Sequence, residues 1–231
     1  MNQHITIASF DLGKKNFAFC VEEIDLKQLD IIKNIPAKQR YNIDGTPTTQ
    51  FNKILNDVYK SGRLILYQNS DITENCDPKA YIDPELFHNM VDLLDKYAYI
   101  WDTCDRFIIE QQMSFGKSRN PLAFKLGMHC YSYFIFRYGR FKKVVEWPAY
   151  HKTKILGASK KIVKKRNGKQ SYIAVDKPTR KKWAVTKAID ILQLRNDNET
   201  IRQLAETKKK DDLADVLCQL QSYKYMILVD K

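Results

Sequence analysis

The stretch HITIASFDLGKKNFAFCVEEI, residues 4–24, decides the fold class. Residues 4–10 are rich in β-branched and apolar side chains, and the run ends at Asp11. Gly13 permits a tight turn, after which the strand pattern resumes at Phe17. The stretch therefore predicts a β-hairpin that opens a sheet, with a carboxylate where its first strand ends.

The rest of the chain alternates between strand-like and helix-like patterns. Further strands are predicted at three short apolar runs, 63–68, 106–110 and 143–147. Helices are predicted where apolar residues recur at helical spacing, at 85–103, 121–137, 179–194 and 211–227. Two polar stretches with Pro or Gly, 33–50 and 69–84, are interpreted as loops or insertions. This order predicts a single α/β domain over 1–231, with a mixed central β-sheet flanked by helices.

Charge and composition narrow the class of protein. Apolar residues make up 44% of the chain, which is enough for a core, and Lys and Arg outnumber Asp and Glu by 39 to 27, a net charge of +12. That excess favours a polyanionic partner, nucleic acid ahead of an acidic membrane surface or solubility alone. The excess is concentrated at 152–182, where Asp176 is the single acid. We interpret 158–178 as a mobile basic loop.

The cysteines and the N-terminal segment indicate the compartment. Five cysteines, an odd number without a CxxC pair, predict buried reduced thiols and neither a zinc site nor a disulfide framework. The first residues lack the features of a signal peptide, and no apolar run is long enough to cross a membrane. We therefore expect a soluble intracellular protein without a membrane association.

Carboxylates stand at three places that suit metal chemistry. Asp11 and Glu110 each end an apolar strand, where a charge is costly without a partner or a metal. In KKKDDLADVLCQLQSY, residues 208–223, Asp212 and Asp215 share a helix face, and Asp211 also approaches Asp215. Taken singly, such acids are more often turn formers or helix caps. Together, in a basic protein, they favour a Mg²⁺ site.

Three strings resemble the RuvC-type Holliday junction resolvases, in particular the poxvirus-like and mitochondrial branches. They are SFDLGKKNFAFC (9–20), FIIEQQ (107–112) and KKDDLADVL (209–217). The resemblance implies an RNase H-like fold with two Mg²⁺ ions, or Mn²⁺ in their place, and no small-molecule cofactor. It implies that the metal ligands are Asp11, Glu110, Asp212 and Asp215, with Asp211 as a residue that shares or replaces the role of Asp212.

The resemblance extends to residues that would contact DNA. WPAYHKTKILG (147–157) and TRKKWAVTKAI (179–189) are similar to family segments that carry lysines, which implies a catalytic role for Lys182 and a place near the scissile phosphate for Lys152. The other residues expected to bind DNA are Lys14, Lys15, Lys117, Arg119, Lys154, Lys160, Lys161, Lys164, Lys165, Arg166, Arg180 and Lys181. Candidate stacking or wedge residues, each with core or loop packing as the alternative, are Phe115, Tyr150 and Trp183.

The function implied is resolution of four-way junctions during recombination or viral genome concatemer processing. Paired nicks require two sites, so a homodimer is implied, with helix 121–137 as a candidate dimer element or a helix buried on two sides. One alternative is a flap, R-loop or RNA–DNA hybrid nuclease, and another is a non-catalytic DNA-binding accessory factor. An actin-like ATPase is discounted because the eight glycines are not clustered. A viral factory or the cytoplasm of an infected cell is favoured over the mitochondrion.

Overall fold

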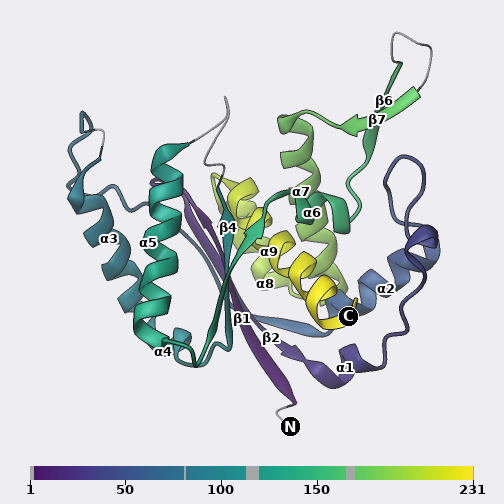
Figure 1. The fold of residues 1–231 in the computed structure, drawn as a ribbon, viewed down its shortest axis with the longest axis horizontal. Helices are drawn as coiled ribbons and strands as arrows, with labels where there is room; N and C mark the ends of the chain where they lie inside the picture. The colour runs from purple at the N-terminus through teal and green to yellow at the C-terminus, as the bar shows by residue number, and fades with distance from the viewer. Residues whose placement is uncertain (1–2, 81, 113–119, 165–169, 231) are drawn as a thin grey trace. The chain divides into compact units, whose positions relative to one another are not determined.

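The computed structural model describes residues 3–80, 82–112, 120–164 and 170–230 (Figure 1). The strands are β1 (His4–Leu12), β2 (Phe17–Asp25), β3 (Gly62–Ser70), β4 (Arg106–Gln111), β5 (Lys143–Pro148), β6 (Lys160–Lys164) and β7 (Gln170–Ala174). The α-helices are α1 (Leu26–Asp30), α2 (Thr49–Lys60), α3 (Pro84–Lys96), α4 (Ala98–Trp101), α5 (Pro121–Tyr138), α6 (Tyr150–Ile155), α7 (Lys177–Leu194), α8 (Asn198–Glu206) and α9 (Lys210–Lys224). A 3₁₀-helix covers Ala37–Gln39, and a π-helix covers Tyr225–Val229.

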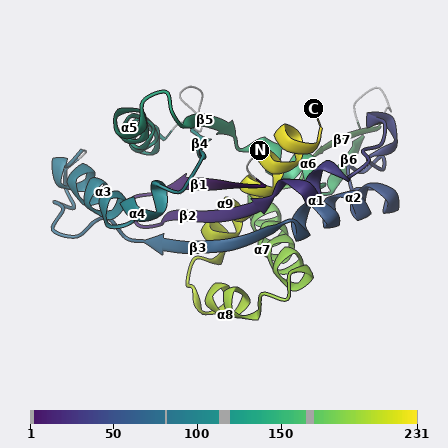
Figure 2. The ribbon, with the colours of Figure 1, turned by 90° about the horizontal axis from the view of Figure 1, so that it is seen from below.

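The chain forms two compact units. The first contains Met1–Ile24 and Arg63–Ala149, and the second contains Asp25–Gly62 and Tyr150–Lys231. The first unit carries a five-stranded sheet with the order β3-β2-β1-β4-β5, whose first three strands lie side by side in Figure 2. Strands β1 and β2 form the predicted hairpin, because a four-residue turn can join neighbouring strands only in antiparallel fashion. Strands β1, β4 and β5 run parallel, so the sheet is mixed, as the sequence predicts.

One face of this sheet carries the core of the first unit. Helices α3 and α5 lie side by side on that face (Figure 1), and α5 packs on β1, β4 and β5. The ring of Phe10 from β1 contacts Trp101 from α4 and Phe134 from α5, with ring centroids 5.5 and 5.2 Å apart. Phe107 of β4 stacks on Phe134 at 4.0 Å. These aromatic contacts fix the helices to the strands, and so the strand ends are held by a well-packed layer.

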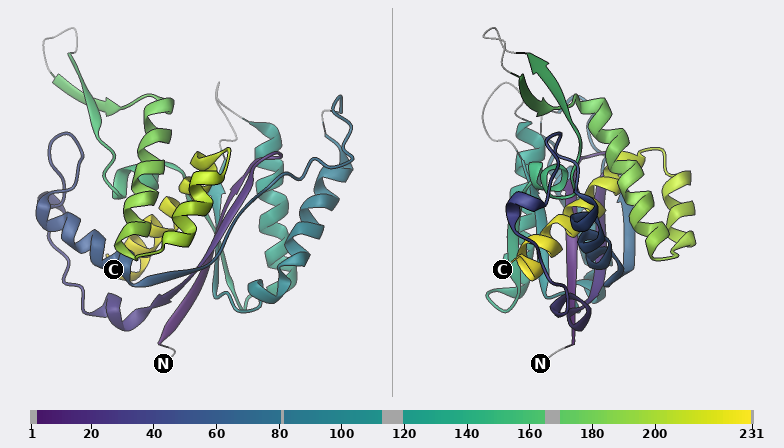
Figure 3. Two further views of the ribbon diagram at one scale, coloured as in Figure 1. Left: turned by 180° about the vertical axis from the view of Figure 1, so that it is seen from behind. Right: turned by 90° about the vertical axis from the view of Figure 1, so that its right-hand side faces the viewer.

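The second unit is built around α9, against which α6, α7, α8 and α2 pack. Arg40 makes two charge-assisted hydrogen bonds to Asp230, at 2.6 and 2.7 Å, which fasten the end of the chain to the segment before α2. The β6–β7 hairpin extends beyond the first turn of α7 (Figures 1 and 3). Its base is fastened where the Lys160 N–H donates to the Asp44 carbonyl at 2.7 Å. The hairpin is therefore an arm with an anchored base.

Several segments differ from their predictions, and the short helices α1, α6 and α8 were not predicted. The helix predicted over 85–103 is two helices, α3 and α4, separated at Tyr97. The segment 158–178, predicted as a basic loop, contains the paired strands β6 and β7, because Ile162, Val163, Tyr172 and Ile173 give it strand character between the lysines. Helix α2, which was not predicted, begins at Thr49, inside the stretch 33–50 that was interpreted as a loop or insertion.

Two further expectations bear on the class of protein. The five cysteines are free thiols, and Cys76 is the least buried of them. Four of the five are buried as the sequence predicts, and Cys76 is only partly buried. In the part of the chain that the structure describes, no helix is both long and apolar enough to cross a membrane.

Candidate active site

In the first unit, two carboxylates stand at the ends of neighbouring parallel strands. Phe10 of β1 pairs in register with Ile109 of β4, and Asp11 and Glu110 are the residues that follow that pair. Side chains alternate along a strand, so these acids project on the face opposite Phe10 and Ile109, which belong to the aromatic core. Asp11 is partly exposed, and Glu110 is 9% exposed. Register thus places the two acids at one edge and on one face of the sheet.

Neighbouring residues shape this edge. The side-chain amide of Gln112 donates to a carboxylate oxygen of Glu110 at 3.4 Å, a long hydrogen bond that orients the acid. Gly127 of α5 faces the same strand ends, because a Cβ there would lie 3.5 Å from Leu12 and 3.8 Å from Gln112. Lys14 and Lys15 are exposed in the turn that follows β1. The edge therefore combines a buried acid and a partly buried acid with exposed positive charge.

In the second unit, three acids occupy the start of α9. Asp211 and Asp212 lie in its first turn, and Asp215 lies one turn later. Lys181 of α7 forms an ion pair with Asp211. Lys152 of α6 forms another with Asp215 at 3.0 Å, and only 12% of the Lys152 side chain is exposed. Among the described residues, Asp212 is the acid of the three without an ion pair.

The pKa values of these groups follow from their partners. Burial and repulsion, first by Asp211 and then by Asp215, raise the pKa of Asp212 to about 6. Burial alone would raise the pKa of Asp211, but the hydrogen bond and charge of Lys181 bring it below its ordinary value. The same hydrogen bond raises the pKa of Lys181. The crowding at Asp212 is the kind that a bound cation relieves.

The other predicted residues are distributed as follows. Lys182, for which a catalytic role was predicted, is exposed, and its neighbour Lys181 is the lysine that contacts an acid. Predicted DNA contacts that are exposed include Lys154, Lys160, Lys161, Lys164 and Arg180. Tyr150 is 59% exposed, and Trp183 is half-buried. The remaining predicted residues, Phe115, Lys117, Arg119, Lys165 and Arg166, lie outside the described residues.

Within the described residues, no group of three or more His, Cys, Asp or Glu side chains is arranged to hold a metal ion. In the second unit, the ion pairs of α9 explain why its three acids do not form such a group. Lys152 and Lys181 already neutralise two of them. The predicted metal ligands are thus present as hard oxygen donors, two in each unit, with Asp211 in addition. Their joint role stays a prediction.

The fold is shared with solved resolvases. The fowlpox virus resolvase, whose structure is a complex with Holliday junction DNA, has a TM-score of 0.52 and 17% identity over 96% of this chain and 99% of that one. Thermus thermophilus RuvC has a TM-score of 0.51 and 12% identity over 96% and 95%. The yeast mitochondrial Holliday junction resolvase has a TM-score of 0.52 and 12% identity over 97% of this chain and 80% of that one. The chain therefore has the RNase H-like fold that its motifs predict.

Two viral proteins are related along the whole chain, although no family model matches. Protein 97L of Invertebrate iridescent virus 3 is 30% identical over 95% of this chain and 100% of its own length. Protein 170L of Invertebrate iridescent virus 6 is 35% identical over 100% of this chain and 93% of its own length. Both are described as uncharacterised. At this identity and coverage, the chain belongs to the same protein family as iridescent virus proteins 170L and 97L.

Proposed function

We propose that the chain is a metal-dependent endonuclease that cuts four-way junctions and other branched DNA, leaving 5′-phosphate and 3′-hydroxyl ends. The observation that carries this proposal is the pair Asp11 and Glu110, which follow registered residues on neighbouring parallel strands of an RNase H-like fold. Carboxylates brought together at a sheet edge in a protein of net charge +12 suit a reaction on a polyanion. Solved proteins of this fold include resolvases.

The donor set fits Mg²⁺. The proposed ligands Asp11, Glu110, Asp212 and Asp215 are all carboxylates, the hard oxygen donors that Mg²⁺ prefers. The repulsion at Asp212 supports the fit, because a cation there replaces an unfavourable interaction with a favourable one. Two divalent ions, when bound, would supply activation of the attacking water and stabilisation of the leaving 3′-oxygen.

The residues of the chain would have two further roles, to hold the metal ions and to bind the scissile phosphate. The four carboxylates would bind and orient the ions, and Gln112 donates a hydrogen bond that holds the carboxylate of Glu110 in place. Lys152 and Lys181 are ion-paired without substrate. We propose that a scissile phosphate competes for these lysines, which then neutralise charge on the phosphate in the transition state. The assignment moves the predicted catalytic lysine from Lys182 to Lys181.

The substrate would be held mainly through its backbone. Exposed lysines at the turn after β1 and on the β6–β7 hairpin offer salt-dependent phosphate contacts. A junction has two strands to nick, so we also propose a homodimer with one site per subunit. The exposed side chains Ile135 and Phe136 on α5 make that helix a candidate dimer element. The iridescent virus relatives support a viral setting, in which such an enzyme would process branched viral genomes within the infected cell.

Removing the positive charge of the arm should flatten the salt dependence of junction binding. The triple substitution Lys160→Ala, Lys161→Ala and Lys164→Ala is expected to reduce the slope of log K against log[salt] by about 2 to 3, since each phosphate contact contributes roughly 0.9. Junction affinity measured by fluorescence anisotropy from low to moderate salt gives the slope. The matched control removes three exposed lysines of the same unit, Lys27, Lys33 and Lys38, and should leave it unchanged. Equal slopes for the two triple variants would exclude the arm from binding.

A panel of synthetic substrates tests the proposed function directly. The full-length protein is incubated with Mg²⁺ and a four-way junction, a flap, an R-loop, an RNA–DNA hybrid or a linear duplex of matched sequence. We expect junction cutting at least about 10² times faster than duplex cutting, because the fixed junction geometry presents two scissile phosphates to a dimer. Faster cutting of flaps or hybrids would support the alternative nuclease of the same fold. Binding without cutting of any substrate would support an accessory factor.

A further inference from the structure

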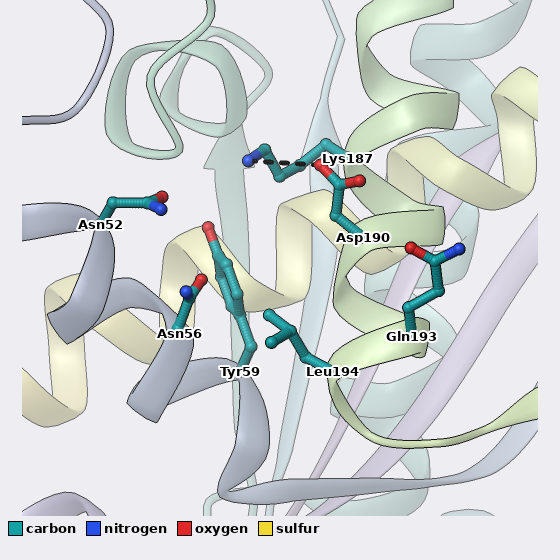
Figure 4. A pocket seen from close by; sticks show the side chains of 7 residues that line it. All are labelled: Asn52, Asn56, Tyr59, Lys187, Asp190, Gln193 and Leu194. Carbon is teal, nitrogen blue, oxygen red and sulfur yellow. Dashed lines mark ion pairs between the residues drawn. The ribbon is translucent and has the colours of Figure 1, made fainter. Parts of the chain in front are cut away.

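A polar cavity lies between α2 and α7 in the second unit. Its volume is about 390 Å³, within the usual range for small-molecule sites, and it opens widely to solvent. Figure 4 shows the side chains that line it from the two helices. The lining residues are Asn52, Asn56, Tyr59, Lys187, Asp190, Gln193 and Leu194. Because the cavity is open to solvent, it can accept a group that remains attached to a larger polymer.

The lining is chemically specific. Asn52 and Asn56 line the cavity from α2 and Gln193 lines it from α7, and each carboxamide offers both a donor and an acceptor. Lys187 and Asp190 form an ion pair at 3.8 Å, which adds one charge of each sign. Leu194 contributes an apolar surface. Paired donors and acceptors beside an apolar side chain match the edge and the face of a heteroaromatic base.

Tyr59 gives independent evidence for a ligand. The residue is 1% exposed, and its buried hydroxyl oxygen, at the wall of the cavity, has no hydrogen-bond partner among the described residues. In Figure 4 the hydroxyl points between Asn52 and Lys187. A buried hydroxyl without a partner costs free energy and is rare in native proteins. A ligand that supplies the partner would remove the cost.

The cavity is close to the acidic start of α9 within the same unit. Lys187 follows Lys181 by six residues on α7, a rise of roughly 9 Å along the helix. At about 3.4 Å per nucleotide along one DNA strand, this rise of roughly 9 Å corresponds to about two to three nucleotides.

We propose that this cavity binds an unpaired nucleobase of the DNA substrate, read through its hydrogen-bonding edge by the carboxamides and the Tyr59 hydroxyl. The proposal rests on the proposed nuclease function and adds a determinant of sequence preference at the cut. Asn and Gln side chains recognise base edges in pairs of hydrogen bonds, and enzymes read extruded bases in the same way. Unpaired or unstacked bases are most accessible at a junction crossover.

The test uses the full-length protein and junctions that carry 2-aminopurine, whose fluorescence rises when it leaves the base stack. The label is placed in turn at each position around the crossover, with Ca²⁺ in place of Mg²⁺ for binding measurements. Wild-type protein should raise the fluorescence at one position at least. The double variant Asn56→Ala, Gln193→Ala should abolish that rise. It should also reduce the preference among junctions that differ in this base from about 10-fold to less than about 2-fold.

Tyr59→Phe separates a binding role from a structural role. Because the hydroxyl has no partner, its removal should leave the melting temperature equal or higher, while the base preference falls. A melting temperature that drops instead would show that the hydroxyl is structural. The double variant Gln28→Ala, Gln50→Ala removes two exposed carboxamides of the same unit outside the cavity and should behave as wild type.

The outcomes distinguish this proposal from the function on which it rests. If the wild type cuts junctions but no label responds, or the cavity variant keeps the response and the preference, the cavity does not read a base and the nuclease function stands. If free 2-aminopurine riboside monophosphate binds as tightly as a labelled junction, the cavity is a nucleotide site and the proposal is overturned. If no substrate is cut, the nuclease function fails, whatever the labels show.

Discussion

Glu110→Gln is expected to lower Mg²⁺-dependent junction cutting by about 10³-fold or more. The substitution keeps the shape of the side chain at the end of β4, where Glu110 is 9% exposed, and removes its negative charge. A neutral amide is a poor ligand for Mg²⁺, and loss of one ligand removes several kcal/mol of transition-state stabilisation. Single-turnover cutting of a labelled four-way junction at saturating protein measures the effect.

The control for this variant is Glu146→Gln, on the neighbouring strand β5. Glu146 is exposed and pairs in register with Ile109, so it lies one strand away on the same sheet. Its substitution should change cutting by less than about 2-fold, the usual size of effect for a surface side chain. Junction binding in Ca²⁺ should also be similar for both variants. Nicking by Glu110→Gln at the wild-type rate would remove Glu110 from the proposed catalytic site.

Local patterns were sufficient to predict the sheet. The hairpin of β1 and β2 and the strands β3, β4 and β5 were predicted because apolar runs of this length, ended by Gly13 or by acids, have few other local structures open to them. Helix α2 was missed although its buried residues Phe51, Ile54, Leu55 and Val58 have helical spacing after the cap at Thr48. The helical spacing was present in the sequence, but the neighbouring polar residues led to the interpretation of this region as a loop or insertion.

The candidate site was predictable only in part, because a local sequence pattern does not show which side chains of distant segments will contact one another. Strand ends fixed the places of Asp11 and Glu110 in the first unit, and helical spacing fixed Asp212 and Asp215 on one face of α9. The partner of Asp211 was not predictable. Lys181 and Lys182 are adjacent, and only the rotation of α7 on α9 decides which of them contacts the acid.

The contact between Lys181 and Asp211 predicts that substitutions of the two adjacent acids, Asp211 and Asp212, will differ strongly in their effect on junction cutting. Asp212→Asn is expected to lower junction cutting by about 10³-fold, whereas Asp211→Asn should lower it by no more than about 10-fold. Asp211 is engaged by Lys181, whereas Asp212 has no ion pair among the described residues, so of these two adjacent acids Asp212 is the more available to a cation. Both variants have the same size and helical context, and single-turnover rates compare them directly.

A double-mutant cycle decides whether Asp211 acts through the lysine. If Asp211 only positions Lys181, then Lys181→Ala should lower cutting about as much as Asp211→Asn, and the double variant should be no worse than either alone. Additive losses would mean that the two residues act separately. A 10³-fold loss for Asp211→Asn with an unchanged melting temperature would reverse the assignment, making Asp211 the metal ligand. The cycle thus resolves the doubled acid at the start of α9 by rates alone, because the two roles predict opposite patterns of coupling with Lys181.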